Sequence, residues 1–258
     1  MSYDKKRVEM ESGCLIALEW DSSFFGRKIA RLVIPEDHWQ PEAVLELLEK
    51  ARRCGVECLY VEIPFRNPGL VALGKFPGFR LVDIKTTLEN TTREPAADEA
   101  DPAITAVPDP RFLPGLNKIM DDLAQKSRFA FDPRFGIGES QRLYREWLRK
   151  SLLENFCSDF LTFLVAGNPQ AFLSLKMRDN VPYMDLLGVA EPFRGQGIGR
   201  RLAEYATGRL SRSGHRCWRI VTQGHNVGAL RLYEKLGFQV MQVNLFYHVW
   251  LDEITPDA

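Results

Sequence analysis

Hydrophobic and polar residues alternate along the first part of the chain with two different periods. Period-two alternation predicts strands over residues 28–34, 56–63 and 80–88. Residues 41–54 place Leu45, Leu47 and Leu48 among charged residues, which predicts an amphipathic helix. A shorter helix is predicted over residues 67–76.

The pattern after residue 102 changes from paired strands to strands that alternate with helices. Residues 127–139 are rich in Phe, Pro, Gly and Arg and predict an ordered loop. Gly167-Asn168 and Asp179-Asn180 predict hairpin turns. The predicted strands are 103–107, 160–166, 171–177, 183–189, 217–222, 238–243 and 245–251, and the predicted helices are 110–126, 140–156, 197–211 and 227–236.

A polar, acidic stretch bracketed by prolines, residues 90–102, separates the two patterned regions and predicts a linker. We therefore expect an N-terminal α/β domain over 1–90, a linker over 91–102 and a C-terminal domain over 103–258. Hairpins followed by alternating helices predict an α/β fold of the α+β type, in which helices cover a mixed sheet.

The chain also resembles itself at a shift of 159 residues. Arg53 then aligns with Arg212, and Gly78-Phe79 aligns with Gly237-Phe238. Other aligned pairs are Gly55 with Gly214, Cys58 with Cys217, Asn67 with Asn226, Gly69 with Gly228 and Leu73 with Leu232. Either the halves are duplicated or two similar segments share turn residues; duplication predicts that residues 28–88 fold like the later helix–strand half.

Composition argues against several classes of function. The net charge is zero, which argues against a general nucleic-acid-binding protein. Five cysteines, an odd number, predict buried thiols in a reducing compartment, and neither they nor the histidines have metal-ligand spacing. The N-terminus lacks an apolar stretch and the apolar runs are short, so we expect a cytoplasmic protein without membrane insertion. The sequence leaves open whether the protein forms a homodimer.

The most informative segment is Arg194-Gly195-Gln196-Gly197-Ile198-Gly199, which follows a predicted strand and leads into a predicted helix. Glycines allow close approach of a ligand, and a helix N-terminus offers unpaired N–H groups at its positive end. Together they suit a diphosphate. The segment lacks the Gly-Lys-Ser/Thr ending of a Walker loop and the third glycine of a dinucleotide fingerprint.

This segment resembles the coenzyme A loop of the GNAT acetyltransferase superfamily, Arg/Gln-x-x-Gly-x-Gly/Ala, over a region of about 103–251. The resemblance implies a C-terminal GNAT domain, with the N-terminal domain as a degenerate half-GNAT without a coenzyme site, and acetyl-CoA as co-substrate. It implies that the coenzyme arm lies along Leu187, Gly188 and Val189 and contacts Asn226. It also implies that Tyr233 protonates the departing thiolate.

Chemistry gives those residues roles independently. A thiol has a pKa of about 8.5 and a tyrosine one of about 10, so a positioned Tyr233 can protonate a leaving thiolate. Structural alternatives are a helix N-cap for Asn226, a C-cap for Gly237 and a core aromatic for Tyr233. Asp185, on the strand before the loop, is a candidate general base, with water as its rival.

A narrower resemblance concerns the amine acceptor. The segment 20–26 and Ser127-Arg128-Phe129, followed by Tyr144 and Trp147, are similar to bacterial TDP-fucosamine acetyltransferases, although Asp185 departs from that pattern. The resemblance implies a sugar-nucleotide acceptor bound by Ser127, Arg128 and Phe129. Arg128, with Arg142 or Arg145, could hold its diphosphate. Peptide or protein N-acetylation is the alternative, and a non-catalytic acyl-CoA-binding module is the alternative of another class.

Overall fold

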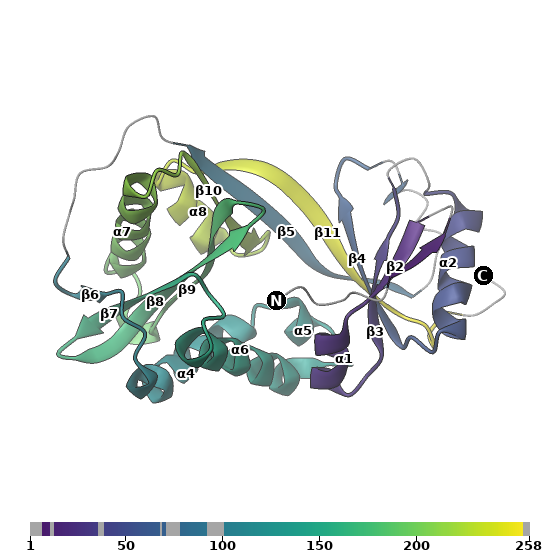
Figure 1. Cartoon of the computed structure of the whole chain (residues 1–258), viewed down its shortest axis with the longest axis horizontal. Coiled ribbons are helices and arrows are strands. Elements are labelled where there is room, and N and C mark those ends of the chain that lie inside the picture. The colour runs from purple at the N-terminus through teal and green to yellow at the C-terminus, as the bar shows by residue number, and fades with distance from the viewer. Residues whose placement is uncertain are drawn as a thin grey trace. The chain divides into compact units, whose positions relative to one another are not determined.

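The computed structural model describes residues 7–10, 13–35, 39–67, 69–70, 78–91 and 101–254. Their contacts define two compact units. The first combines the described residues up to Lys85 with those from Val243 onward, and the second covers Thr86–Gln242. The division falls inside two long strands, β5 (Phe79–Thr91) and β11 (Gln239–Trp250), so each strand contributes to both units (Figure 1). Residues 243–254, assigned by sequence to the C-terminal domain, thus belong to the first unit.

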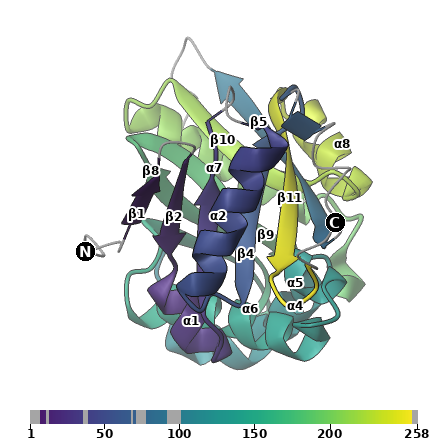
Figure 2. The same cartoon turned by 90° about the vertical axis from the view of Figure 1, so that its right-hand side faces the viewer.

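The first unit is a mixed sheet with one face covered by a helix. Its strands follow the order β1-β2-β3-β4-β11, with β3 and β4 parallel and the other neighbouring pairs antiparallel. Figure 2 shows α2 lying across this sheet, and the helix buries Val44, Leu47, Leu48 and Ala51 in the core of the unit. The elements are β1 (Arg7–Met10), β2 (Gly13–Ala17), α1 (Glu19–Phe25), β3 (Ile29–Val33), α2 (Pro41–Arg53) and β4 (Cys58–Pro64).

The second unit is a mixed sheet with helices on both faces, in the strand order β5-β10-β9-β8-β7-β6 (Figure 1). Its remaining strands are β6 (Ile104–Thr105), β7 (Asp159–Val165), β8 (Asn168–Arg178), β9 (Val181–Val189) and β10 (Cys217–Gln223). Its helices are η1 (Pro110–Phe112), α4 (Leu113–Ala124), α5 (Arg128–Phe131), α6 (Gly136–Leu153), η2 (Glu191–Phe193), α7 (Ile198–Arg212) and α8 (Val227–Lys235).

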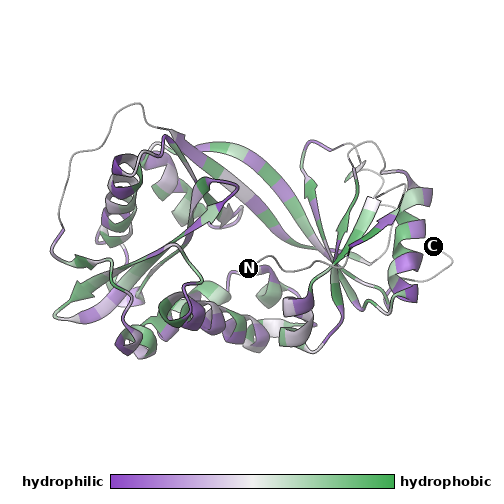
Figure 3. Cartoon of the chain, viewed as in Figure 1, coloured by the Kyte–Doolittle hydropathy of each residue, from purple (hydrophilic) through white to green (hydrophobic). Residues whose placement is uncertain are grey.

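The two faces of β9 receive different helices. Gly188 faces α4, because a methyl group there would lie 2.5 Å from Cγ2 of Ile119. Its neighbours Leu187 and Val189 point to the other face, where they lie against Gly199 of α7. Side chains of α7 and α8 join the strands in one apolar core, while the outer surfaces of α6 and α7 are largely hydrophilic (Figure 3).

The mixed α/β fold class is confirmed, and most predicted elements appear near their expected positions. Asp179 and Asn180 have φ angles of 49° and 62°, as a two-residue hairpin turn requires. The other turn lies one residue earlier than predicted, at Ala166 and Gly167, with φ angles of 49° and 77°. The predicted helix 67–76 and linker 91–102 lie mostly outside the described residues.

Two expectations were wrong. Residues 127–139 are not one loop, because Ser127 caps α5 and the carbonyl of Asp132 accepts N–H groups as α6 begins at Gly136. The two predicted final strands are one, β11, because Asn244 is accommodated in mid-strand by a 2.6 Å hydrogen bond to Glu62. The segment 20–26 lies mainly in helix α1, where Trp20 and Phe24 stack with centroids 5.0 Å apart, and its role as a site motif stays a prediction.

The resemblance at a shift of 159 residues has a structural counterpart. Helices α2 and α7 end at Arg53 and Arg212, and strands β4 and β10 span positions separated by that same shift at both ends. In each unit a parallel strand pair, β3-β4 or β9-β10, is followed in the sheet by the long strand from the other half of the chain. This correspondence supports duplication, which stays a proposal.

Candidate functional site

Strand β9 contains a β-bulge at Asp185. Ser174 of β8 pairs with Leu186 and Leu175 pairs with Met184, so Asp185 is the extra residue. The bulge interrupts the alternation of side chains, and Met184 and Leu187 consequently both contribute to the core beneath α7. Simple alternation, which would place Asp185 on the face opposite Met184 and Leu186, therefore does not hold through this position.

Beyond the bulge, the described residues of β9 and β10 are no longer paired in register. In the described residues, the register of their ladder consists of Tyr183 with Arg219 and Met184 with Ile220. The N–H of Ala190 donates to Gln170 on the β8 side, at 2.8 Å. Since backbone groups alternate along a strand, those of Leu187 and Val189 point away from β8, toward β10. A ligand arm could pair with them there.

The glycine segment forms a tight turn at the end of β9. Gly195 and Gly197 have φ angles of 77° and 79°, a region that side chains other than glycine rarely adopt. A methyl group on either would meet no protein atom within 4 Å. Helix α7 starts immediately after Gly197 without a side-chain cap, so its first N–H groups face outward at the positive end of the helix dipole. This geometry suits a diphosphate.

Arg194 holds the turn in place. Its Nε donates to the carbonyl oxygen of Val189 at 3.0 Å, and its guanidinium pairs with Asp122 of α4. Gln196 donates back to the carbonyl of Pro192 at 2.9 Å. The side chains of Arg194 and Gln196 therefore brace the loop. Asp122 was missed by sequence reasoning, since nothing local distinguishes it from other acidic residues of an amphipathic helix.

Asn226 lies immediately before α8, and Tyr233 lies near the other end of that helix. Tyr233 is buried in the α7-side core, and burial raises the pKa of its hydroxyl well above the ordinary value. The hydroxyl therefore keeps its proton at neutral pH. Asn226 precedes α8 but makes no side-chain cap; its Nδ2 donates to Thr222 at 3.3 Å. Leu232, next to Tyr233, lies against Gly199, which brings α8 to the glycine turn.

The three residues predicted to bind the acceptor have mostly structural surroundings. Ser127 is buried, with its hydroxyl 2.5 Å from that of Ser140. Phe129 is also buried and packs edge-on against Phe135. Arg128 is partly exposed and lies over the Phe129 ring. Instead, the exposed Phe131 reaches His225, with ring centroids 5.1 Å apart. Burial and the Lys126 charge lower the pKa of His225.

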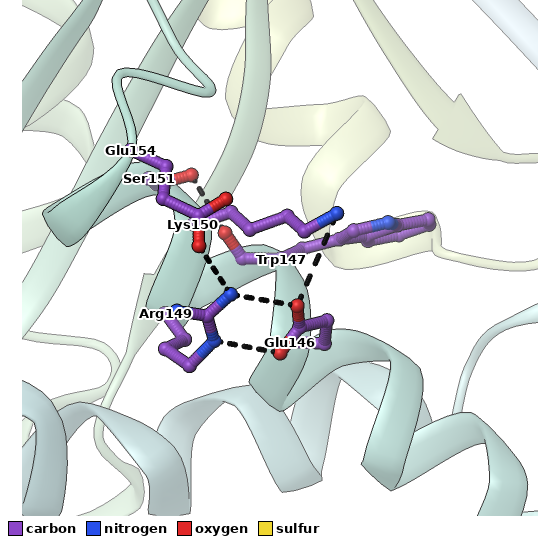
Figure 4. Close-up of polar contacts among 6 residues, drawn as sticks. All are labelled: Glu146, Trp147, Arg149, Lys150, Ser151 and Glu154. Atoms are coloured by element: carbon purple, nitrogen blue, oxygen red, sulfur yellow. Dashed lines mark hydrogen bonds and ion pairs between the residues drawn. The ribbon is translucent and has the colours of Figure 1, made fainter. Parts of the chain in front are cut away.

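The α6 arginines are neutralised by carboxylates of their own. Arg142 pairs with Glu139, and Arg145 makes two bonds to Asp121. Arg149 is paired with Glu146 and Glu154, as Figure 4 shows, beside the hydrogen bond from Ser151 to the carbonyl of Trp147. This is the pattern of a solvated helix face. Because Arg142 and Arg145 already pair with carboxylates, they are less suited to bind a diphosphate than the sequence indicated.

The bulge residue Asp185 is held between two cations. Its carboxylate lies 2.9 Å from Nζ of Lys176 and also pairs with Arg178. Its side chain is only 14% exposed. Each of its two oxygens is engaged by a cation, which opposes its action as a base.

The described residues contain neither a membrane-spanning helix nor a metal-binding cluster. None of the helices there is long and apolar enough to cross a membrane. No group of three or more histidine, cysteine, aspartate or glutamate side chains in that part of the chain could hold a metal ion.

Comparison with known proteins agrees with this geometry. Residues 120–238 match the model of the acetyltransferase (GNAT) family. The spore coat polysaccharide biosynthesis protein SpsD of Bacillus subtilis is 29% identical over 143 residues, which cover 55% of this chain and 49% of SpsD. The chain thus aligns with about half the length of that relative.

Solved structures share the fold over nearly the whole chain. A GCN5-related N-acetyltransferase from Kribbella flavida has a TM-score of 0.63 at 18% identity and covers 95% of this chain and 89% of its own. A tandem GNAT protein from the clavulanic acid biosynthesis pathway has a TM-score of 0.59 at 13% identity, with 96% and 80% covered. The chain therefore has a mixed α/β fold of the GNAT kind, and the segment that matches the GNAT family model, residues 120–238, contains the glycine turn and Tyr233.

Proposed function

We propose that the protein is an acetyl-CoA-dependent N-acetyltransferase that acts on a primary amine. The observation that carries this proposal is the uncapped start of α7 behind two left-handed glycines, beside the β10-facing backbone of Leu187 and Val189. The turn would hold the coenzyme diphosphate and the strand edge would pair with the coenzyme arm. Asn226, which lies between β10 and α8, would contact that arm.

Tyr233 has the properties of the general acid. The acceptor nitrogen forms a bond to the acetyl carbon, the carbon–sulfur bond breaks, and the electron pair stays on sulfur. The neutral Tyr233 hydroxyl would give its proton to that thiolate. Burial raises the pKa of the hydroxyl, so Tyr233 enters the reaction protonated, as a proton donor must.

Asp185 is our candidate for accepting the proton that the amine loses. It lies at the bulge, before the part of β9 proposed to pair with the arm. Both of its oxygens are engaged by cations, so it would act only if the acceptor displaces one of them. Water is the rival base.

We propose an amino sugar linked to a nucleotide as the acceptor. The support is the likeness to SpsD, whose name assigns it to polysaccharide biosynthesis, and the short α5 segment, whose exposed Phe131 approaches the loop after β10. Peptide and protein amines are the second candidate, since the GNAT match by itself does not select an acceptor.

The decisive screen offers acetyl-CoA with TDP- and UDP-linked 4-amino and 3-amino dideoxy sugars beside peptides, and measures coenzyme A release. We expect release with at least one sugar nucleotide. Turnover with peptides alone would refute the acceptor class, whereas binding of acetyl-CoA without any turnover would favour a non-catalytic acyl-CoA-binding module.

A further inference from the structure

A cationic patch lies on the sheet face opposite α7. Lys176 and Arg219 each pair in register with Tyr183, and directly paired residues point to the same face. Arg178, two residues after Lys176 on β8, stacks over the Tyr183 ring, 4.7 Å from its centroid. The β8–β9 hairpin turn at Asp179-Asn180 fixes the positions of Lys176 and Arg178, and the parallel pairing of β9 with β10 adds Arg219 beside Tyr183.

The patch has more positive than negative charge. Lys176 and Arg178 share one carboxylate, Asp185, and Arg219 pairs with Glu89 at 2.8 Å and donates to the Tyr183 hydroxyl at 3.3 Å. The described residues of the patch thus hold three cations and two carboxylates. The arginines of α6 differ, because carboxylates match their charge. Arg149 has two carboxylate partners, and Arg145 makes two hydrogen bonds to Asp121.

Arg178 has donors to spare. Its side chain is 45% exposed, and its contacts in the described part of the chain are the pair with Asp185 and the stack on Tyr183. Guanidinium carries five N–H donors in a planar fork that matches phosphate oxygens. Stacking on a fixed ring orients that fork, so little further ordering is needed when an anion binds.

The patch lies at the acyl end of the proposed coenzyme position. With the diphosphate at the glycine turn, which follows the end of β9, the arm would run back along Val189 and Leu187 toward the bulge at Asp185. The acceptor amine must reach the acetyl group there. A cationic surface beside that point suits the anionic part of an acceptor.

We infer that Lys176, Arg178 and Arg219, arranged around Tyr183, bind the diphosphate of a nucleotide-linked acceptor. This inference rests on the proposed function for the acceptor's amine, but the anion site itself can be tested without turnover. It replaces Arg128, Arg142 and Arg145 as the principal diphosphate ligands.

The first test measures binding by calorimetric titration with TDP. We expect saturable binding to the parent protein, weakened about 10-fold or more in Arg178→Gln, since charge-assisted bonds to phosphate are among the stronger hydrogen bonds. Arg178→Lys keeps the charge but loses the fork and should fall between the two. Arg149→Gln, on the solvated face of α6 and paired with carboxylates of its own, is the matched control and should bind TDP like the parent. A parent protein that does not bind TDP, or equal weakening in both Gln variants, overturns the inference.

The second test separates this site from the catalytic proposal. Acetylation kinetics are compared for a TDP-linked 4-amino sugar and for the same amino sugar as an uncharged glycoside. Arg178→Gln should raise KM about 10-fold for the first acceptor only, with acetyl-CoA affinity at the parent value as proof of an intact fold. Equal KM changes for both acceptors would contradict the anion site. No acetylation by the parent would instead refute the proposed function, with the TDP titration still deciding the site.

Discussion

Two glycines of nearly identical backbone conformation allow the coenzyme loop to be tested against its own control. Gly197 and Gly167 have φ angles of 79° and 77°, and a methyl group added at either position would have no protein atom within 4 Å. Gly197 precedes α7, whereas Gly167 lies in the β7–β8 hairpin turn. Glutamate at either position should cost about 1–2 kcal/mol of stability, the penalty for a side chain in the left-handed region.

The two substitutions should differ in coenzyme binding. A carboxylate at position 197 would face the bound diphosphate, and like charges about 4 Å apart near a protein surface repel by about 4 kcal/mol. That corresponds to roughly a 1,000-fold loss of affinity. Calorimetric titration with acetyl-CoA should therefore show binding to Gly167→Glu and none measurable to Gly197→Glu, while urea unfolding shows similar stability. Equal acetyl-CoA affinity in the two variants would refute the loop assignment.

Three further substitutions test separate parts of the molecule. Tyr233→Phe should lower kcat about 100-fold with acetyl-CoA affinity unchanged; full activity would make the tyrosine structural. Asp185→Asn should remove the acidic limb of the pH–rate profile, and a profile that overlays the parent would leave water as the base. Burial alone would raise the pKa of Glu62, but Lys85 and Asn244 lower it below its ordinary value. The ionised carboxylate therefore stabilises the fold above about pH 4.3, and this stabilisation is lost as the pH falls further. Glu62→Gln should therefore lose about 1–3 kcal/mol in urea unfolding at pH 7 and less at pH 3.5, and equal losses at both would contradict this.

Elements with a strong local signal could be predicted from sequence. Helix α2 could be predicted to within one residue because a period of 3.6 separates its buried leucines from its charges. The glycine turn could be predicted because left-handed backbone is accessible to few other residues. The single strand β11 could not, because Asn244 is tolerated only through its contact with Glu62, 182 residues away.

The details of the site depend on packing that has no local signature. The bulge at Asp185 appears only in the register between β8 and β9. Arg194 was expected in the coenzyme loop, but its pairing with Asp122 joins residues 72 positions apart. Ser127 and Phe129 look like site residues in sequence, yet their burial beneath α6 reflects how α5 packs. Which residues line an acceptor site is therefore decided by tertiary structure.

The central claim is acetyl transfer from acetyl-CoA to an amine, and acetyl-labelled acetyl-CoA tests it most directly. The purified chain is incubated with the labelled coenzyme and the panel of sugar-nucleotide and peptide amines, beside the Tyr233→Phe variant. We expect label in an N-acetylated sugar nucleotide, at a rate about 100-fold lower in the variant. Label that stays on the coenzyme with every amine, although the protein binds acetyl-CoA, would contradict the claim.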